Sequence, residues 1–208
     1  MELEFHEMAS GLRFPEGPIA VSDGSVILLE IERQTLSRVL ADGTIQVIAK
    51  LEGGPNGAAV GPDGAIYVCN NGGFNWIKRN TRILPGTQPE HFRGGSIQRV
   101  DMSSGKVDTL YQECSGNVLR GPNDIVFDKN GSFWFTDLGK MRDRDRDYGG
   151  LYFANITGTH IEEKIFPIPG GGNGVGLSPD GKSIYVAETS SGRLFGWDLQ
   201  DDGELPDG

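Results

Sequence analysis

Five side chains that carry amide or carboxylate oxygens recur at one point of a repeated sequence segment. Oxygen donors of these two kinds are the ligands that Ca²⁺ prefers, and the set contains none of the imidazole or thiolate groups that favour zinc or copper. Two carboxylates and up to three amides would also leave coordination positions for water and substrate. The sequence therefore predicts a site for a divalent cation, most readily Ca²⁺. The five residues are Glu16, Asn56, Asn123, Asn173 and Asp207.

An Asn before Gly or Asp is also a common turn residue, because its side chain can hydrogen-bond its own backbone. A single Asn-Gly pair would be explained best in that way. Here Asn recurs at one position of successive repeats, and acids replace it at Glu16 and Asp207. A purely structural turn would not require that exchange, so the pattern favours a shared function.

The repeat that carries these residues is clearest at residues 54–72, 121–139 and 172–188, which align almost without gaps. Each copy contains an Asn, a short apolar segment, a tight turn of the Pro-Asp-Gly or Lys-Asn-Gly type, and an aromatic-rich segment. Gly supplies the positive φ that short hairpin loops need, and β-branched and aromatic residues favour strands. A weaker copy covers residues 16–30, and a fifth begins at 205–208.

Further strand candidates follow these hairpins, which gives about four short antiparallel strands per repeat. They lie at residues 36–40, 44–49, 96–100, 106–111, 150–154, 160–166 and 192–198. The five recurring residues are separated by 40, 67, 50 and 34 positions, by subtraction of their numbers. Four-stranded units of roughly 40–50 residues are typical of propeller blades. Residues 74–95 are polar and poorly periodic, and we interpret them as a loop insertion that lengthens the second repeat.

The fold predicted is an all-β propeller, with one domain over residues 1–208 that holds about four blades and the start of a fifth. No stretch of the sequence predicts a long amphipathic helix. Each recurring Asn or acid stands just before the innermost strand of its blade, and these points converge around the central channel. We therefore expect the five side chains to face one another at one mouth of that channel.

Composition and charge exclude several classes of protein. The chain has a net charge of −10 and a pI near 4.7, which disfavours nucleic acid as a partner. Cys69 and Cys114 stand in unrelated contexts, so we expect buried thiols and no disulfide framework. The N-terminal residues are acidic and have no apolar core of a signal peptide, and no apolar run reaches the length of a membrane span. We expect a cytoplasmic protein.

Four motifs together resemble the senescence-marker-protein, gluconolactonase and regucalcin-like family. They are Phe-Pro-Glu-Gly-Pro at 14–18, Gly-Pro-Asn-Asp-Ile at 121–125 with Phe-Thr-Asp at 135–137, Asn-Gly-Val-Gly-Leu-Ser-Pro-Asp-Gly at 173–181, and Leu-Pro-Asp-Gly at 205–208. The resemblance covers nearly the whole chain. It implies a six-bladed propeller with one divalent metal, usually calcium, and members that continue for about two more blades.

The resemblance also implies roles for individual residues. Glu16, Asn173 and Asp207 correspond to metal ligands, and Asp207 also to the general base or nucleophile. Asn123 corresponds to a residue that contacts the metal or the substrate. Arg120 lies near the position of a substrate-binding Arg, although its offset from Asn123 differs by one residue. Asn56 is proposed as a substrate-lining residue from the internal repeat alone.

The function that these features predict is metal-dependent hydrolysis of a sugar-type lactone, a small-molecule substrate. A serine hydrolase is disfavoured because the chain has no Gly-x-Ser-x-Gly motif. Two alternatives stay open: a related metal-dependent esterase or phosphotriesterase on the same propeller, and a non-catalytic propeller that binds calcium or another ligand. The alternating charges at residues 141–147 are interpreted as a solvated loop.

Overall fold

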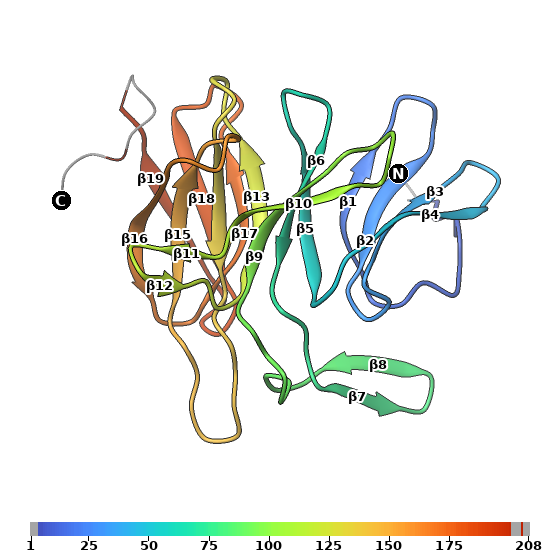
Figure 1. Cartoon of the computed structure of the whole chain (residues 1–208), viewed down its shortest axis with the longest axis horizontal. Coiled ribbons are helices and arrows are strands. Elements are labelled where there is room, and N and C mark those ends of the chain that lie inside the picture. Colours follow the sequence, from blue (N-terminus) through green and yellow to red (C-terminus); the bar gives the residue numbers. More distant parts are fainter. Residues whose placement is uncertain (1–3, 201–204, 206–208) are drawn as a thin grey trace.

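The computed structural model describes residues 4–200 and 205, and it consists of antiparallel sheets that stand side by side (Figure 1). The described residues contain no helix, and so none that is long and apolar enough to cross a membrane. Sheet order follows chain order within each unit, so every unit is an up-and-down blade. The predicted all-β propeller of about four blades is confirmed. The predicted start of a fifth blade, apart from Leu205, lies outside the described residues.

Three blades have four strands each. The first contains β1 (Pro15–Ala20), β2 (Val26–Glu30), β3 (Thr35–Val39) and β4 (Ile45–Lys50). The second contains β5 (Pro55–Val60), β6 (Ile66–Asn70), β9 (Ser96–Val100) and β10 (Val107–Tyr111). The third contains β13 (Pro122–Phe127), β14 (Phe133–Asp137), β15 (Gly149–Ala154) and β16 (Ile161–Ile168). The predicted strands agree with these bounds to within about two residues, the usual uncertainty of strand ends.

The fourth blade has three strands in the described part of the chain: β17 (Gly172–Leu177), β18 (Ser183–Glu188) and β19 (Arg193–Asp198). The hairpin between the first two strands of every blade turns at a Gly with positive φ, from 69° at Gly181 to 85° at Gly131. An L side chain rarely adopts that conformation, whereas Gly adopts it freely. This confirms the turn positions predicted from the repeat.

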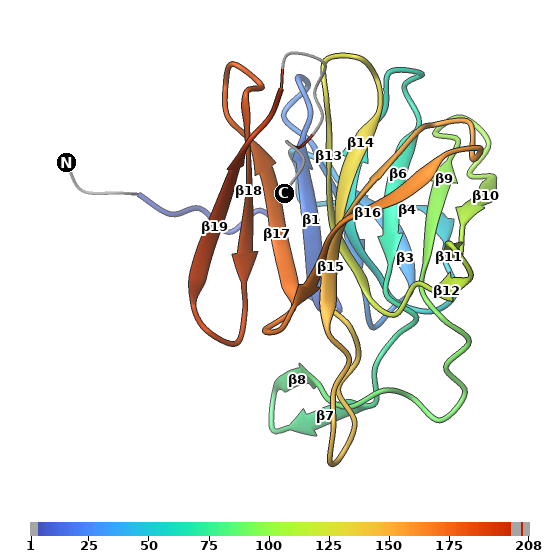
Figure 2. The same ribbon diagram turned by 90° about the vertical axis from the view of Figure 1, so that its left-hand side faces the viewer.

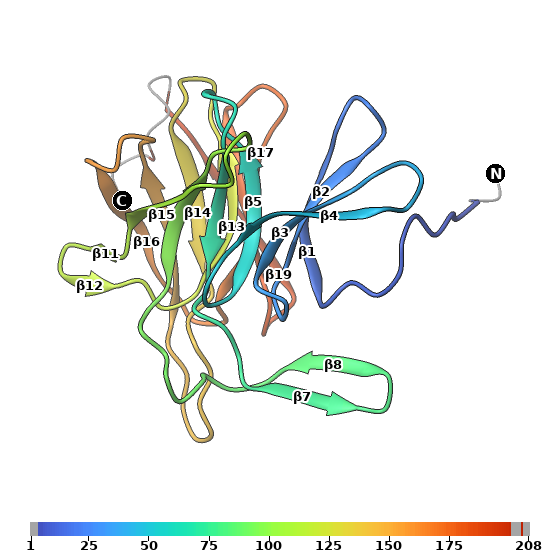
Figure 3. The same cartoon turned by 45° about the vertical axis from the view of Figure 1, so that its right-hand side comes forward.

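The innermost strands pack directly on one another around the channel. Strand β5 contacts both β1 and β13, and β13 contacts β17, as Figure 3 shows for β5, β13 and β17. Glycine is required where the backbones approach most closely. A Cβ at Gly57 would lie 2.3 Å from the carbonyl oxygen of Asn123, and one at Gly17 would lie 2.8 Å from that of Asn56. Close packing of this kind fixes the relative positions of side chains carried by neighbouring blades.

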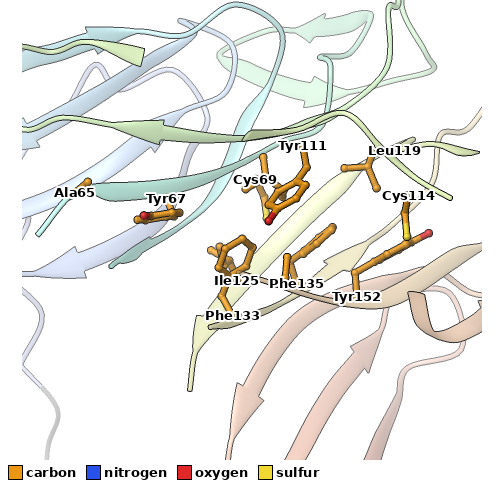
Figure 4. Packing of buried hydrophobic residues seen from close by; sticks show 12 residues of the cluster. Ala65, Tyr67, Cys69, Tyr111, Cys114, Leu119, Ile125, Phe133, Phe135 and Tyr152 are labelled. Carbon is orange, nitrogen blue, oxygen red and sulfur yellow. The ribbon is translucent and has the colours of Figure 1, made fainter. Parts of the chain in front are cut away.

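The core consists of three apolar layers between successive blades. The middle layer, between the second and third blades, is rich in aromatic rings (Figure 4). Phe135 stacks on Tyr152 with a ring separation of 5.0 Å, and Tyr67 packs against Phe133 at 5.8 Å. Cys69 and Cys114 are buried there as free thiols, as predicted. Burial of these large rings supplies much of the cohesion between blades.

The insertion at residues 74–95 is not the simple loop that the sequence suggested. It contains a two-stranded hairpin, β7 (Trp76–Arg79) and β8 (Arg82–Pro85), with Asn80 in the left-handed conformation at φ 53°. Asn tolerates this conformation better than most residues, which allows a two-residue turn. The hairpin projects from the same end of the molecule as the segment between β14 and β15 (Figures 1 and 2). A second small hairpin, β11 (Glu113–Cys114) with β12 (Asn117–Val118), was also not predicted.

Candidate active site

Four of the five recurring residues meet in the structure. Glu16, Asn56, Asn123 and Asn173 all line a cavity of about 330 Å³ between the inner strands and the segments that project beyond them. The same four also line a smaller cavity of about 170 Å³ that continues along the inner strands. The first cavity has the size of a small-molecule site. Asp207, the fifth residue, lies outside the described residues.

A β-bulge in each inner strand accompanies every one of these four residues. In each blade, the residue just before the candidate ligand pairs with the last residue of the blade's second strand. The pairing register between the first two strands then shifts, after Glu16 in β1, Pro55 in β5, Pro122 in β13 and Gly172 in β17. A bulge changes the direction of a side chain relative to the regular alternation of a strand. The repeat therefore places one oxygen-bearing side chain per blade at the channel.

A polar residue at the end of the second strand supports this arrangement in every blade. Asp137 accepts hydrogen bonds from the backbone N–H groups of Gly121 and Gly139, each at 2.7 Å. The equivalent residues also accept backbone N–H groups from the loop that leads into the inner strand: Glu30 from Arg13, Asn70 from Gly54, and Glu188 from Gly170. All four are buried. They hold the loops that precede the candidate ligands.

These supporting residues also have a signal in the sequence, which was not among the predictions above. They stand 14 positions after Glu16, Asn56 and Asn123, since 30 − 16, 70 − 56 and 137 − 123 are all 14, and 15 positions after Asn173, since 188 − 173 is 15. Glu, Asn, Asp and Glu at one position of a repeat follow the same kind of exchange that identified the ligand candidates.

The Asn side chains have oxygens free of protein partners. Nδ2 of Asn173 donates to Oγ1 of Thr189 at 2.8 Å, which fixes the amide and leaves its Oδ1 without a protein donor in the part of the chain that is described. Asn56 and Asn123 are 7% and 8% exposed, and their side chains make no hydrogen bond with any described residue. Buried polar groups are normally satisfied, so these amides are available to a ligand.

Two carboxyl groups beside the Asn side chains are electrostatically coupled. Desolvation raises the pKa of Glu16, although the residue as a whole is exposed, and the nearby Asp124 carboxylate raises it further. Burial likewise raises the pKa of Asp124, whose oxygens accept the N–H groups of Val175, at 3.0 Å, and Ile125, at 2.9 Å. A cation at this position would relieve the repulsion between the two carboxylates.

The donor set fits calcium and does not fit zinc. Within the described ranges, no group of three or more His, Cys, Asp or Glu side chains could hold a metal ion. The candidate site therefore depends on amide oxygens together with the Glu16 carboxylate, a mixture that Ca²⁺ accepts.

Arg120, proposed from the family resemblance as a substrate-binding residue, is not among the residues that line this cavity. Its backbone N–H donates to Asp137 at 2.8 Å, and its Nε donates to Asp147 at 3.1 Å. Its guanidinium also lies 5.5 Å from the ring centre of Phe92. These contacts connect Arg120 to the loops around the site.

Other cavity residues come from the insertion at residues 74–95 and from the segment between β14 and β15. Phe74 and Pro85 belong to the insertion, and Met141 and Arg146 belong to the segment interpreted as a solvated loop. Most of that segment is exposed, but these two side chains border the cavity. Lys140 also lines it and is only 2% exposed. These contacts join segments distant in sequence, so no local pattern could reveal them.

Comparison with known proteins agrees with this fold. Residues 14–208 match the family described as SMP-30/Gluconolactonase/LRE-like region. A gluconolactonase from Zymomonas mobilis is 25% identical over 220 residues, which is 94% of this chain and 55% of that protein. Among solved structures, a gluconolactonase from Xanthomonas campestris has a TM-score of 0.71 at 21% identity, over 94% of this chain and 61% of that one.

A calcium-binding protein named regucalcin, from Agrobacterium tumefaciens, has a TM-score of 0.68 at 19% identity, over 96% of this chain and 58% of that one. At such identities the structural matches establish the fold. The chain spans about half the length of the curated relatives it matches. Fold and site together define a β-propeller with a ring of amide and carboxylate oxygens at its channel. The chain belongs to the SMP-30/gluconolactonase/LRE-like family, as its four motifs predicted.

Proposed function

We propose that this chain is part of a calcium-dependent hydrolase that opens a sugar-type lactone. The observation that carries the proposal is the meeting of Glu16, Asn56, Asn123 and Asn173 in one cavity of a member of this family. Relatives named gluconolactonase support the choice of lactone as substrate class. The cavity of about 330 Å³ suits a ligand the size of a monosaccharide.

The proposed calcium ligands are Glu16, Asn123, Asn173 and Asp207. When bound, a calcium ion would polarise the lactone carbonyl and stabilise the negative charge that develops on its oxygen. Thr189 orients the Asn173 amide so that its oxygen can act as a ligand. Glu16 supplies the carboxylate from the first blade, and its raised pKa is the expected property of an acid that is desolvated before a cation binds.

The remaining chemistry falls to side chains around the ligands. Asp207 is proposed as the general base or nucleophile, either accepting a proton from water or attacking the carbonyl carbon directly. Asn56 is proposed to hydrogen-bond a hydroxyl of the sugar, because its buried amide is free of described protein partners. Hydrolysis yields the open hydroxy acid, which releases one proton near neutral pH.

Proton release during lactone hydrolysis tests this function. We expect the 208-residue chain to hydrolyse a neutral hexonolactone with Ca²⁺, and we expect a chelator to abolish turnover. Asn173→Ala should lose activity. Asn130→Ala, at an exposed position of the β13–β14 turn, should retain it.

Two other functions share the same ligand ring. A metal-dependent esterase or phosphotriesterase would turn over acyclic esters or phosphotriesters faster than lactones. Calcium binding without turnover of any lactone, ester or phosphotriester would instead indicate a propeller that only binds ligands.

A further inference from the structure

Two cationic side chains border the same cavity as the oxygen ring. Lys140 and Arg146 lie on the segment between β14 and β15, and both line the same cavity as Asn123 and Glu16. The oxygen ring is suited to a cation, whereas these two side chains are suited to an anion. The cavity therefore carries groups suited to both signs of charge.

Lys140 is a buried cation without a carboxylate partner. Its Nζ donates to the carbonyl oxygen of Gly73 at 2.7 Å and to Oδ1 of Asn71 at 3.2 Å, and it lies 4.2 Å from the ring centre of Phe74. No carboxylate of a described residue lies within 4.0 Å of it. An ammonium group has three N–H donors, so two hydrogen bonds leave one for a ligand. Nδ2 of Asn71, beside it, is buried and also has no described partner.

Two neighbouring arginines have a carboxylate partner that Lys140 and Arg146 lack in the described part of the chain. Arg120 and Arg142, which do not line the cavity, both bind the carboxylate of Asp147, at 3.1 Å and 2.8 Å. Arg146 instead donates to the hydroxyl of Ser190 and, at 3.0 Å, to the carbonyl of Gly170. Within the described ranges, no carboxylate lies within salt-bridge distance of Arg146 either. Arg120 and Arg142 thus share one carboxylate, whereas Lys140 and Arg146, which line the cavity, form no ion pair within 4.0 Å among the described residues.

Burying an unneutralised ammonium group is unfavourable unless a ligand completes its environment. Burial lowers the pKa of Lys140 to about 7, which the more distant Asp137 and Asp147 carboxylates oppose. A bound anion would restore the charged form. Met141, Phe74 and Pro85 give the cavity apolar walls.

We propose that Lys140, assisted by Arg146 at the rim, binds a carboxylate carried by the substrate, so that the substrate is a lactone of a sugar diacid. This inference rests on the proposed lactonase function, because it assigns the oxygen ring to the lactone carbonyl and the cationic side to the far end of the same molecule. Lys140 is then a specificity residue that does not contact the reacting atoms.

The test compares two substrates that differ only in the far group: a hexonolactone with a terminal hydroxymethyl and a hexarolactone with a terminal carboxylate. We expect the wild-type chain to favour the carboxylate substrate in kcat/KM by about tenfold or more, the usual contribution of a charge-assisted hydrogen bond. Lys140→Met should lower kcat/KM for that substrate by a similar factor, mainly through KM, with little effect on the neutral lactone. Lys129→Met, at an exposed turn position, is the matched control.

Arg146→Gln supplies a second variant at an exposed position, where folding is not at risk, and it should reduce the same preference by a smaller factor. The proposal would be overturned if Lys140→Met lowered kcat/KM equally for both lactones. It would also be overturned if the wild type preferred the neutral lactone. Binding of the hexarate dianion to the chelator-treated chain, measured by calorimetry, separates this proposal from the lactonase function. Binding that depends on Lys140 supports the anion site even if neither lactone is hydrolysed, and absence of such binding contradicts it.

Discussion

Thr189 orients the amide of Asn173: Nδ2 of Asn173 donates to Oγ1 of Thr189 at 2.8 Å, and Oδ1 is left for another partner. Thr189 comes directly after Glu188, the residue that holds the loop before β17. Ligand orientation and loop position in the fourth blade therefore depend on adjacent residues at the end of one strand.

Thr189→Val should weaken calcium binding about tenfold, the usual effect of losing a group that orients a metal ligand. The substitution keeps the shape of the side chain and removes only the hydroxyl. Calcium titration by calorimetry measures the effect, with Thr109→Val on the exposed face of β10 as control. An unchanged dissociation constant in Thr189→Val would mean that Asn173 does not need this hydrogen bond to act.

Asp137→Ala should destabilise the fold by about 3 kcal/mol or more, because it leaves several buried backbone donors unpaired. Its carboxylate accepts N–H groups of Arg120, Gly121 and Gly139. Asp128→Ala, which removes an acceptor from an exposed turn, should have the smaller effect, about 1 kcal/mol. Urea unfolding of the two variants compares them, and equal losses would contradict the supporting role of Asp137.

Gly57→Ala should disrupt the contact between β5 and β13. Its Cβ would lie 2.3 Å from a carbonyl oxygen of Asn123, so the inner strands would have to separate. We expect a loss of about 1–3 kcal/mol in stability, together with weaker calcium binding. Gly176→Ala, on inner strand β17, meets nothing within 4 Å and should be tolerated. Thermal unfolding distinguishes the two, and a fully stable Gly57→Ala would show that the backbones are not closely packed.

Lys140 should make stability depend on pH in a defined direction. Its pKa is about 7 in the folded protein, whereas the ordinary value of 10.5 applies to the unfolded chain. Between pH 7 and 10.5 the unfolded chain therefore binds more protons at this residue. Stability of the wild type relative to Lys140→Met should therefore rise with pH in that window, by up to about 1.4 kcal/mol per unit. The unfavourable burial of charge is fully present below pH 7. If the difference in unfolding free energy between the wild type and Lys140→Met stayed constant from pH 6 to 9, the Lys140 pKa would not be lowered.

Most of the fold could be predicted because the chain repeats itself. Turn glycines and aromatic strands recur in register, so one correctly interpreted hairpin identified the others. Alignment of the repeats also predicted that Glu16, Asn56, Asn123 and Asn173 would meet, since equivalent positions of propeller blades converge on the channel.

The rest of the site depends on contacts that a repeat does not encode. The hairpin β7–β8 and the segment around Lys140 occur once each, and only the folded chain brings Nζ of Lys140 to the carbonyl of Gly73. The contacts of Arg120 depend on the fold for a similar reason. Its preferred partner, Asp147, lies 27 residues away in a segment whose alternating charges suggested only solvation.

Calcium titration into the chelator-treated 208-residue chain tests the central claim most directly. We predict one binding site that is strongly weakened by Glu16→Gln and by Asn123→Ala and is unaffected by Asn130→Ala. Absence of calcium binding, or binding that survives both substitutions, would contradict the assignment of the oxygen ring as the metal site.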